Sequence, residues 1–187
     1  MPKLTEQRVH DRRTAILDAA EALFAERGFA DTSMADIVAA SGVATGTVYR
    51  YFDNKDAVVM AVSENVIGVR FDPDAGEPLP LDEAMTALIS AASNRRLGQI
   101  SNQVWARATG SARLQSMIAE RHAQVCRWLA RAIDQVTEPG EATLRRAEVV
   151  ICAVSGLQER VASGVDVDTE AFRANLLTFA APGGAGS

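Results

Sequence analysis

The chain has 187 residues and a formal net charge of −5, with 48% hydrophobic and 23% charged residues. These proportions are those of an ordinary globular protein, and the acidic balance excludes a protein that is basic over its whole surface. Its beginning is polar, and no apolar run reaches the ~18 residues that span a bilayer, so we expect a cytoplasmic protein without export signal or membrane contact. The distant pair Cys126 and Cys152 does not indicate a disulfide framework.

Periodic apolar patterning predicts α-helix along almost the whole chain, because alanine, leucine and arginine are abundant and strand-like alternation is scarce. After the first helix, Gly28 is expected to take a left-handed conformation that lets Phe29 fold back on Phe24. Residues 71–80 contain three prolines and a glycine, which predicts a loop. We therefore expect an all-α fold with helices over residues 12–27, 34–41, 44–52, 54–69, 81–94, 97–109, 112–136, 141–164 and 169–180.

Two of these helices are short and are separated by a very short turn. Ser33 and Asp36 give the first of them, 34–41, a start like a capping box, and Gly42 ends it. The spacing to the next helix, 44–52, is that of a helix-turn-helix, whose second helix projects from the surface. At a length of roughly 12 Å, that helix is comparable to the width of the DNA major groove.

The second short helix carries an unusual set of hydroxyl groups. Val48 and Phe52 are four residues apart and should face inward. Tyr49 and Tyr51 are the only tyrosines in the chain, and Thr47 lies beside them. Three hydroxyl groups on one small helix are costly to bury but suit a polar partner such as DNA phosphates.

A family resemblance covers about a quarter of the chain, in the run AILDAAEALFAERGFADTSMADIVAASGVATGTVYRYFDNKDAVVMAV from Ala15 to Val62. This run resembles the TetR family of bacterial transcription regulators, and the aromatic ending followed by Lys55 is its most specific part. The resemblance implies a helix-turn-helix DNA-binding domain with a short arm over residues 1–53. It further implies a helical effector-binding and dimerisation domain over 54–180, and we expect a disordered tail over 181–187.

The resemblance also implies roles for single residues. The hydroxyl groups and Lys55 would bind phosphates, and Arg50 would either read a guanine or hold a phosphate. A basic arm, residues 8–13, would lie along the DNA backbone or in the minor groove. Ala44 lacks the side-chain cap that serine commonly supplies in the family, unless Thr45 caps the helix one residue later. The expected DNA-contacting residues are Ser33, Thr45, Gly46, Thr47, Tyr49, Arg50, Tyr51 and Lys55.

One short helix contacts few base pairs, so specific binding favours a twofold homodimer on a palindromic operator. In the helix expected over 141–164, residues 149–154 are apolar nearly all round and need cover on every side. A second copy of the chain is the expected cover, and in the resembling family the last two helices pack across the dimer. The alternative is that these residues close the core of the monomer. The expected interface residues are Val150, Val154, Leu157, Val161, Phe172 and Leu176.

The helices over 81–136 would hold a small-molecule effector in such a regulator, which would then be a repressor released by its ligand. Mixed apolar and polar side chains there suit a pocket for an apolar or aromatic ligand with a polar or anionic group. The alternative for each of them is core packing. The candidate wall residues are Trp105, Met117, Arg121, His122, Cys126 and Trp128.

Two other function classes stay open from the sequence. An all-helical enzyme is the first, but the sequence has none of the common hydrolase, metalloprotease or phosphate-loop motifs. His122 and Cys126 are four residues apart, a spacing that suits metal, yet two ligands do not make a site. The second alternative is a DNA-bound scaffold that answers a protein partner. We expect no enzyme activity, no cofactor and no metal.

Overall fold

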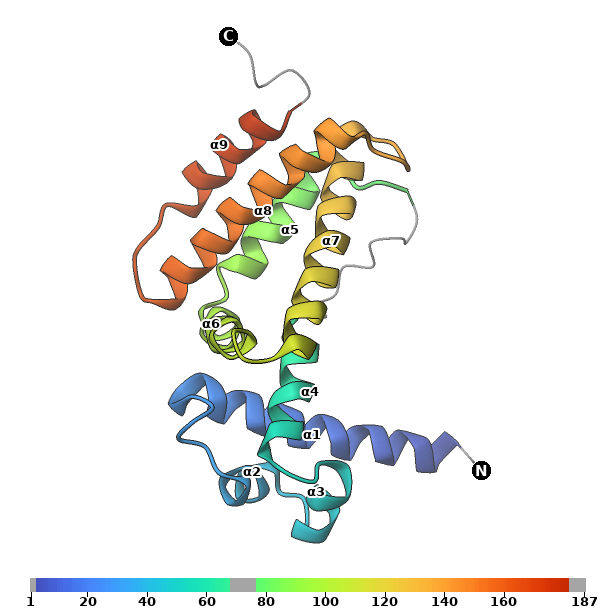
Figure 1. Ribbon diagram of the computed structural model, residues 1–187, viewed down its shortest axis with the longest axis vertical. Coiled ribbons are helices and arrows are strands. Elements are labelled where there is room, and N and C mark those ends of the chain that lie inside the picture. The colour runs from blue at the N-terminus through green and yellow to red at the C-terminus, as the bar shows by residue number, and fades with distance from the viewer. Residues whose placement is uncertain (1–2, 68–76, 182–187) are drawn as a thin grey trace.

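The computed structural model describes residues 3–67 and 77–181, and all regular structure within them is α-helical. Figure 1 shows α1 lying across one end of the molecule with α2 and α3 below it, while α4 leads towards a bundle formed by the later helices. Every helix in the described residues is too short or too polar to cross a lipid bilayer. The helices are α1 (Lys3–Arg27), α2 (Met34–Ser41), α3 (Thr45–Tyr51), α4 (Lys55–Ile67), α5 (Leu81–Ala92), α6 (Arg95–Ala108), α7 (Ala112–Asp134), α8 (Glu141–Ala162) and α9 (Thr169–Ala180).

The expected helices are all present, and most ends agree within two or three residues. The exception is α1, which begins at Lys3 instead of residue 12, so the expected basic arm is wrong as an extended segment: residues 8–13 belong to a helix. Residues 77–80 of the expected loop are not helical, whereas 71–76 and most of the expected tail lie outside the described residues.

The turn after α1 follows local side-chain chemistry. Gly28 has φ of 85°, the left-handed conformation that glycine adopts without strain. Phe29 then returns to Phe24, with ring centroids 4.8 Å apart in an edge-to-face arrangement. The Thr32 hydroxyl donates to the Gly28 carbonyl at 2.9 Å. The prediction for this turn is confirmed.

A first hydrophobic core joins α1–α4 to later helices. Ile16, Ile37 and Val48 from α1, α2 and α3 have no exposed surface. Val58 from α4 and Ile100 from α6 belong to the same core. The hydrophobic core beneath the helix-turn-helix therefore includes residues beyond 53, because α4 and α6 contribute side chains to it.

A second core holds α5, α7, α8 and α9 together. Met85, Leu129 and Val150 have no exposed surface and lie at its centre. α6 approaches α8 closely where Gly98 faces Ala162, since an added Cβ at Gly98 would lie 2.9 Å from the Ala162 Cβ. α6 thus contributes residues to the first core and packs against α8, a helix of the second core.

Polar contacts join α6 to α1, to the turn that follows α1 and to α4. The Gln103 side chain accepts a hydrogen bond from the Phe29 N–H at 2.7 Å and donates to the Phe24 carbonyl at 2.9 Å. Surface ion pairs join Arg107 to Asp56, Arg113 to Glu64 and Arg96 to Glu21. Exposed pairs contribute little, so Gln103 is the main polar contact between α6 and the end of α1.

Gln103→Ala is expected to lower the free energy of unfolding by about 1 kcal/mol, because the partly buried Phe29 N–H loses its partner. Asn102→Ala is the matched control, since Asn102 is exposed one position earlier on α6. Urea unfolding of both variants measures the difference. Equal stability of the two variants would show that water replaces Gln103 without cost.

Candidate DNA-reading helix and effector cavity

The candidate DNA-reading helix is α3. Val48 is fully buried and Phe52 is 5% exposed, so their side of the helix faces the first core as expected. Tyr49 is 45% exposed, and Arg50 on the next position is also exposed. The helix therefore presents a tyrosine and an arginine to solvent at the end of the molecule where α2 and α3 lie in Figure 1.

The start of α3 is open to a partner. Thr45 and Gly46 are exposed, and Thr47 is half-buried. Ala44 caps the helix without any side-chain hydrogen bond, so Thr45 does not serve as a substitute cap. An added Cβ at Gly46 would meet nothing within 4 Å in the chain itself. The backbone at this end is accessible to a close approach.

Ser33 has a structural role at the start of α2. Its hydroxyl accepts from the Asp36 N–H at 3.2 Å and its backbone N–H donates to the Asp36 carboxylate at 2.8 Å, which completes the expected capping box. The Ser33 hydroxyl also donates to this carboxylate at 2.6 Å. These hydrogen bonds from Ser33 hold the pKa of Asp36 below its ordinary value. Because the pKa of Asp36 is lower in the folded chain, the cap stabilises α2 fully at pH values above the pKa of Asp36 in the unfolded chain. This stabilisation is lost as the pH falls through the pKa of Asp36 in the folded chain.

Tyr51 and Lys55 differ from the exposed pair because both bind within the chain. The Tyr51 hydroxyl donates to the Val9 carbonyl at 3.3 Å. The Lys55 ammonium donates to the carbonyls of Phe29 at 2.8 Å and Ala30 at 3.2 Å. Each group keeps some capacity for another partner, because a hydroxyl also accepts and an ammonium has three donors. Both residues hold α1, α3 and α4 in place as well as lying near the DNA-proximal end.

The amino-terminal half of α1 lies beside α3. The contact from Tyr51 to Val9 joins them, and the Arg13 guanidinium lies 5.7 Å from the centre of the Phe52 ring. Arg8, Arg12 and Arg13 are exposed on this half of α1. These arginines therefore lie on a helix near α3, and their contact with DNA stays a prediction.

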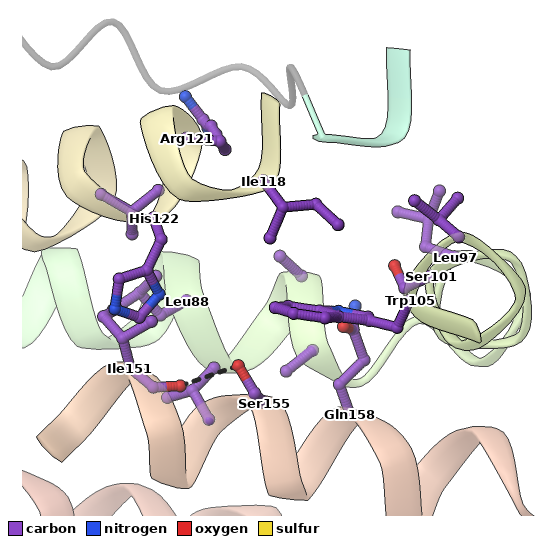
Figure 2. Close-up of a pocket in the computed structure, with 15 residues that line it drawn as sticks. Leu88, Leu97, Ser101, Trp105, Ile118, Arg121, His122, Ile151, Ser155 and Gln158 are labelled. Atoms are coloured by element: carbon purple, nitrogen blue, oxygen red, sulfur yellow. Dashed lines mark hydrogen bonds between the residues drawn. The ribbon is translucent and has the colours of Figure 1, made fainter. Parts of the chain in front are cut away.

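A cavity of about 200 Å³ lies among α5, α6, α7 and α8 (Figure 2). Three of the expected wall residues line it: Trp105, Arg121 and His122. In Figure 2 the Trp105 ring extends into the cavity from α6 and His122 points inward from α7, whereas the Arg121 guanidinium points away. The other lining residues are Leu88, Ala91, Ala92, Leu97, Ser101, Val104, Ile118, Val125, Ile151, Val154, Ser155 and Gln158.

The remaining three expected wall residues are corrected by the structure. Cys126 and Trp128 lie in the second core at 7% and 9% exposure. Met117 packs against the first core. They lie on α7 like His122, but a helix turns each side chain in a different direction. Within the described residues, His122 and Cys126 have no third histidine, cysteine or carboxylate near them that would complete a metal site.

Comparison with known proteins follows the same division of the molecule. A family model described as bacterial regulatory proteins of the tetR family matches residues 16–62, which span α1 to α4. Over 177 residues the chain is 28% identical to the HTH-type transcriptional regulator TtgR of Pseudomonas putida, covering 86% of this chain and 84% of that protein. The chain belongs to the TetR family.

This TetR-family chain is a DNA-binding transcriptional regulator and not an enzyme. It is also 48% identical over 48 residues to the HTH-type transcriptional repressor KstR2 of Rhodococcus jostii, covering 26% of this chain and 24% of that protein. A TetR transcription regulator from Haloarcula marismortui has the same fold, with a TM-score of 0.71 at 18% identity over 91% of this chain and 97% of that chain. The helix-turn-helix prediction and the all-α prediction are confirmed.

The outer face of α8 and α9 in this TetR-family regulator differs from the expected interface. Val150, Val154 and Leu157 are at most 8% exposed within a single chain. A side chain already covered by its own chain has little surface left for a second copy, so these three residues pack mainly within the second core. Val161, Phe172 and Leu176 are half-buried. The exposed apolar residues on these two helices are Val149 at 52% and Phe179 at 37%.

The two cysteines of this regulator should differ sharply in reactivity. Burial raises the pKa of Cys126 to about 11, so its reactive thiolate is about 100-fold scarcer near pH 8 than at its ordinary pKa. Cys152 is exposed. With a thiol reagent acting on the folded monomer, Cys126→Ser is expected to leave the labelling kinetics unchanged and Cys152→Ser to abolish labelling, whereas a dimer formed through the outer face of α8 would slow the labelling of Cys152. Rapid native labelling of the Cys152→Ser variant would contradict the buried position of Cys126.

Proposed function

We propose that this regulator binds a palindromic DNA operator as a homodimer and is released from it by a small molecule held in the cavity among α5–α8. Repression is supported by the similarity to KstR2, a transcriptional repressor. As a DNA-binding regulator, the protein would act in the cytoplasm, where a bacterial chromosome lies. The single observation that carries the proposal is the exposed pair Tyr49 and Arg50 on a helix whose opposite side is buried.

The proposed DNA surface consists of α3 and its immediate neighbours. Arg50 would contact a base edge or a phosphate, and Tyr49 with Thr47 would hydrogen-bond phosphates. Thr45 and Gly46 would lie closest to the base edges, because the start of α3 is exposed and uncapped. Tyr51 and Lys55 already form hydrogen bonds within the chain, so they would contact phosphates only through their remaining hydrogen-bonding groups. Ser33 and the exposed arginines of α1 would contribute at the edge of this surface.

The proposed dimer would form through the outer face of α8 and α9. Val149 and Phe179 supply exposed apolar surface there, and the family packs its last two helices across the dimer. An added Cβ at Gly156 would meet nothing within 4 Å in the chain, so the backbone of α8 is open to close approach by another helix. Val161, Phe172 and Leu176 would lie at the border between this face and the core.

The proposed release mechanism depends on α6. One side of α6 lines the cavity with Ser101 and Trp105, and another holds the end of α1 through Gln103. A ligand that shifts α6 would therefore change the position of α1 and the core that supports α3. The free energy of operator binding would weaken by the difference between the ligand's binding free energies to the DNA-binding form and to the released form. This difference is typically ~1–3 kcal/mol.

Selection of binding sites from random duplexes tests the DNA role and the symmetry together. The expected result is an inverted repeat whose half-sites are separated by about one helical turn, roughly 34 Å, or a multiple of it. An enriched site without inverted symmetry would contradict the dimer, and no enrichment at low salt would contradict specific DNA binding. If small-molecule metabolites from cells release the protein from the selected operator, the result would favour a small-molecule effector over a protein partner.

A further inference from the structure

The cavity among α5–α8 specifies more than the presence of a ligand. We propose that its ligand is a small, planar aromatic molecule with a neutral hydrogen-bonding group, stacked against Trp105 with its polar end towards His122. This inference rests on the proposed function in taking the cavity as the effector site. Size, shape and charge each contribute a separate argument.

The size of the cavity limits the ligand to one or two rings. Its volume is about 200 Å³, which is below the ~300–1,000 Å³ of sites for drug-sized ligands. It is somewhat larger than an apolar cavity of about 150 Å³ that binds benzene. A single aromatic ring with a short substituent fills this space, whereas a long acyl chain or a large polycyclic compound would extend out of its open side.

The shape of the cavity favours a flat ligand. Trp105 is 54% exposed although it is a large aromatic residue. Figure 2 shows its ring edge-on in the middle of the site, with Ile118 above and Gln158 below. An aromatic ligand that stacks on the indole would cover this surface and gain ~0.5–1.5 kcal/mol beyond the burial of area. A saturated ring of the same size would lack that gain.

The polar groups at the cavity favour a neutral ligand that forms hydrogen bonds. Among the lining residues that the structure describes, none is aspartate or glutamate, so a cation would lose water without gaining a carboxylate. Arg121 points away from the cavity in Figure 2, which leaves an anion without a directed partner. His122 points inward from α7, and its imidazole can donate or accept. The Ser155 hydroxyl already donates to the Ile151 carbonyl at 2.9 Å, so it offers the ligand an acceptor.

Isothermal titration of the full-length protein without DNA tests the ligand class with four probes of similar size. They are 4-ethylphenol, its saturated counterpart 4-ethylcyclohexanol, the cation 4-methylbenzylammonium and the anion 4-ethylbenzoate. We expect 4-ethylphenol to bind once per chain and at least about fivefold more tightly than the saturated alcohol, as one stacking contact supplies. It should also bind more tightly than the two charged aromatic probes, which lose hydration without gaining a charged partner. Equal or tighter binding of the saturated or charged probes, or no binding of 4-ethylphenol at millimolar concentration, would overturn the proposal.

Variants of Trp105 distinguish stacking from simple filling of space. Because Trp105 is more than half exposed, Trp105→Leu and Trp105→Phe should both fold, which thermal melting checks. Trp105→Leu should lower the affinity for 4-ethylphenol about fivefold and leave that for 4-ethylcyclohexanol unchanged, whereas Trp105→Phe should retain most of the difference. Equal losses for both probes would overturn the stacking.

The outcome can be separated from that of the proposed function. Ligand binding is measured on the free protein, and operator selection is made without ligand. Failure of the phenol to bind, with a palindrome still selected, would overturn the ligand class alone. Binding of the phenol without any effect on the selected operator would contradict the release mechanism instead.

Discussion

Val149→Arg is expected to convert the proposed dimer into a folded monomer and to weaken operator binding by at least about 100-fold, because a monomer loses the gain from two linked half-sites. Val149 is 52% exposed on α8, so the arginine costs the single chain little. In a dimer it would bury an unpaired charge. Light scattering gives the mass, and titration of the selected operator gives the affinity.

Val136→Arg is the matched control for the dimer. Val136 is 42% exposed just after the end of α7, away from the outer face of α8 and α9. This variant should remain dimeric and keep its operator affinity, which separates a local interface from a general effect of added charge. If Val149→Arg stayed dimeric with full affinity, the subunits would have to meet through another surface.

Arg50→Ala is expected to weaken operator binding by ~1–3 kcal/mol for each half-site if the guanidinium reads a guanine. Tyr49→Phe should weaken it further by about 1 kcal/mol, the net worth of one hydrogen bond. Both side chains are exposed, so the melting temperature should not change. Titrations of the selected operator and of single-base variants at several salt concentrations measure these effects.

The salt series decides what Arg50 contacts. If Arg50 binds a base, the variant should lose discrimination at one operator position while the salt dependence changes little. If it binds a phosphate, affinity should fall uniformly for all sequences and the salt slope should decrease by about one for each half-site. Arg127→Ala, at an exposed arginine on α7 outside both proposed surfaces, is the control and should leave operator binding unchanged. A parallel loss of folding in Arg50→Ala would indicate a structural residue.

The sequence predicted the DNA-proximal end well because its determinants are local. Gly28 and Phe29 are within five residues of Phe24, and Ser33 and Asp36 are three residues apart. Such short-range chemistry can be read from spacing alone. The prediction that the first helix begins only at residue 12 was wrong because residues 3–11 contain no strong helix breaker, so α1 includes them.

The cavity and the subunit surface were harder to predict because they depend on how separate helices meet. Trp105 and His122 were found as isolated polar or aromatic interruptions, but Gln158 and Ser101 were missed because nothing in the sequence brings α8 near α6. In α8 the apolar residues occupy nearly every position from Val149 to Val154. Periodicity cannot then tell which stripe faces the core, and only the packing assigns Val150 to the inside and Val149 to the outside.

The position of Gln103 between the cavity and α1 has a consequence for gene control. Under the proposed release mechanism, its two hydrogen bonds to the end of α1 carry a shift of α6 to the helices that support α3. Shortening this side chain would weaken that connection, so that an inducer would still fill the cavity but would release less of the protein from its operator. The response to an inducer could thereby be weakened without altering either the inducer or the operator.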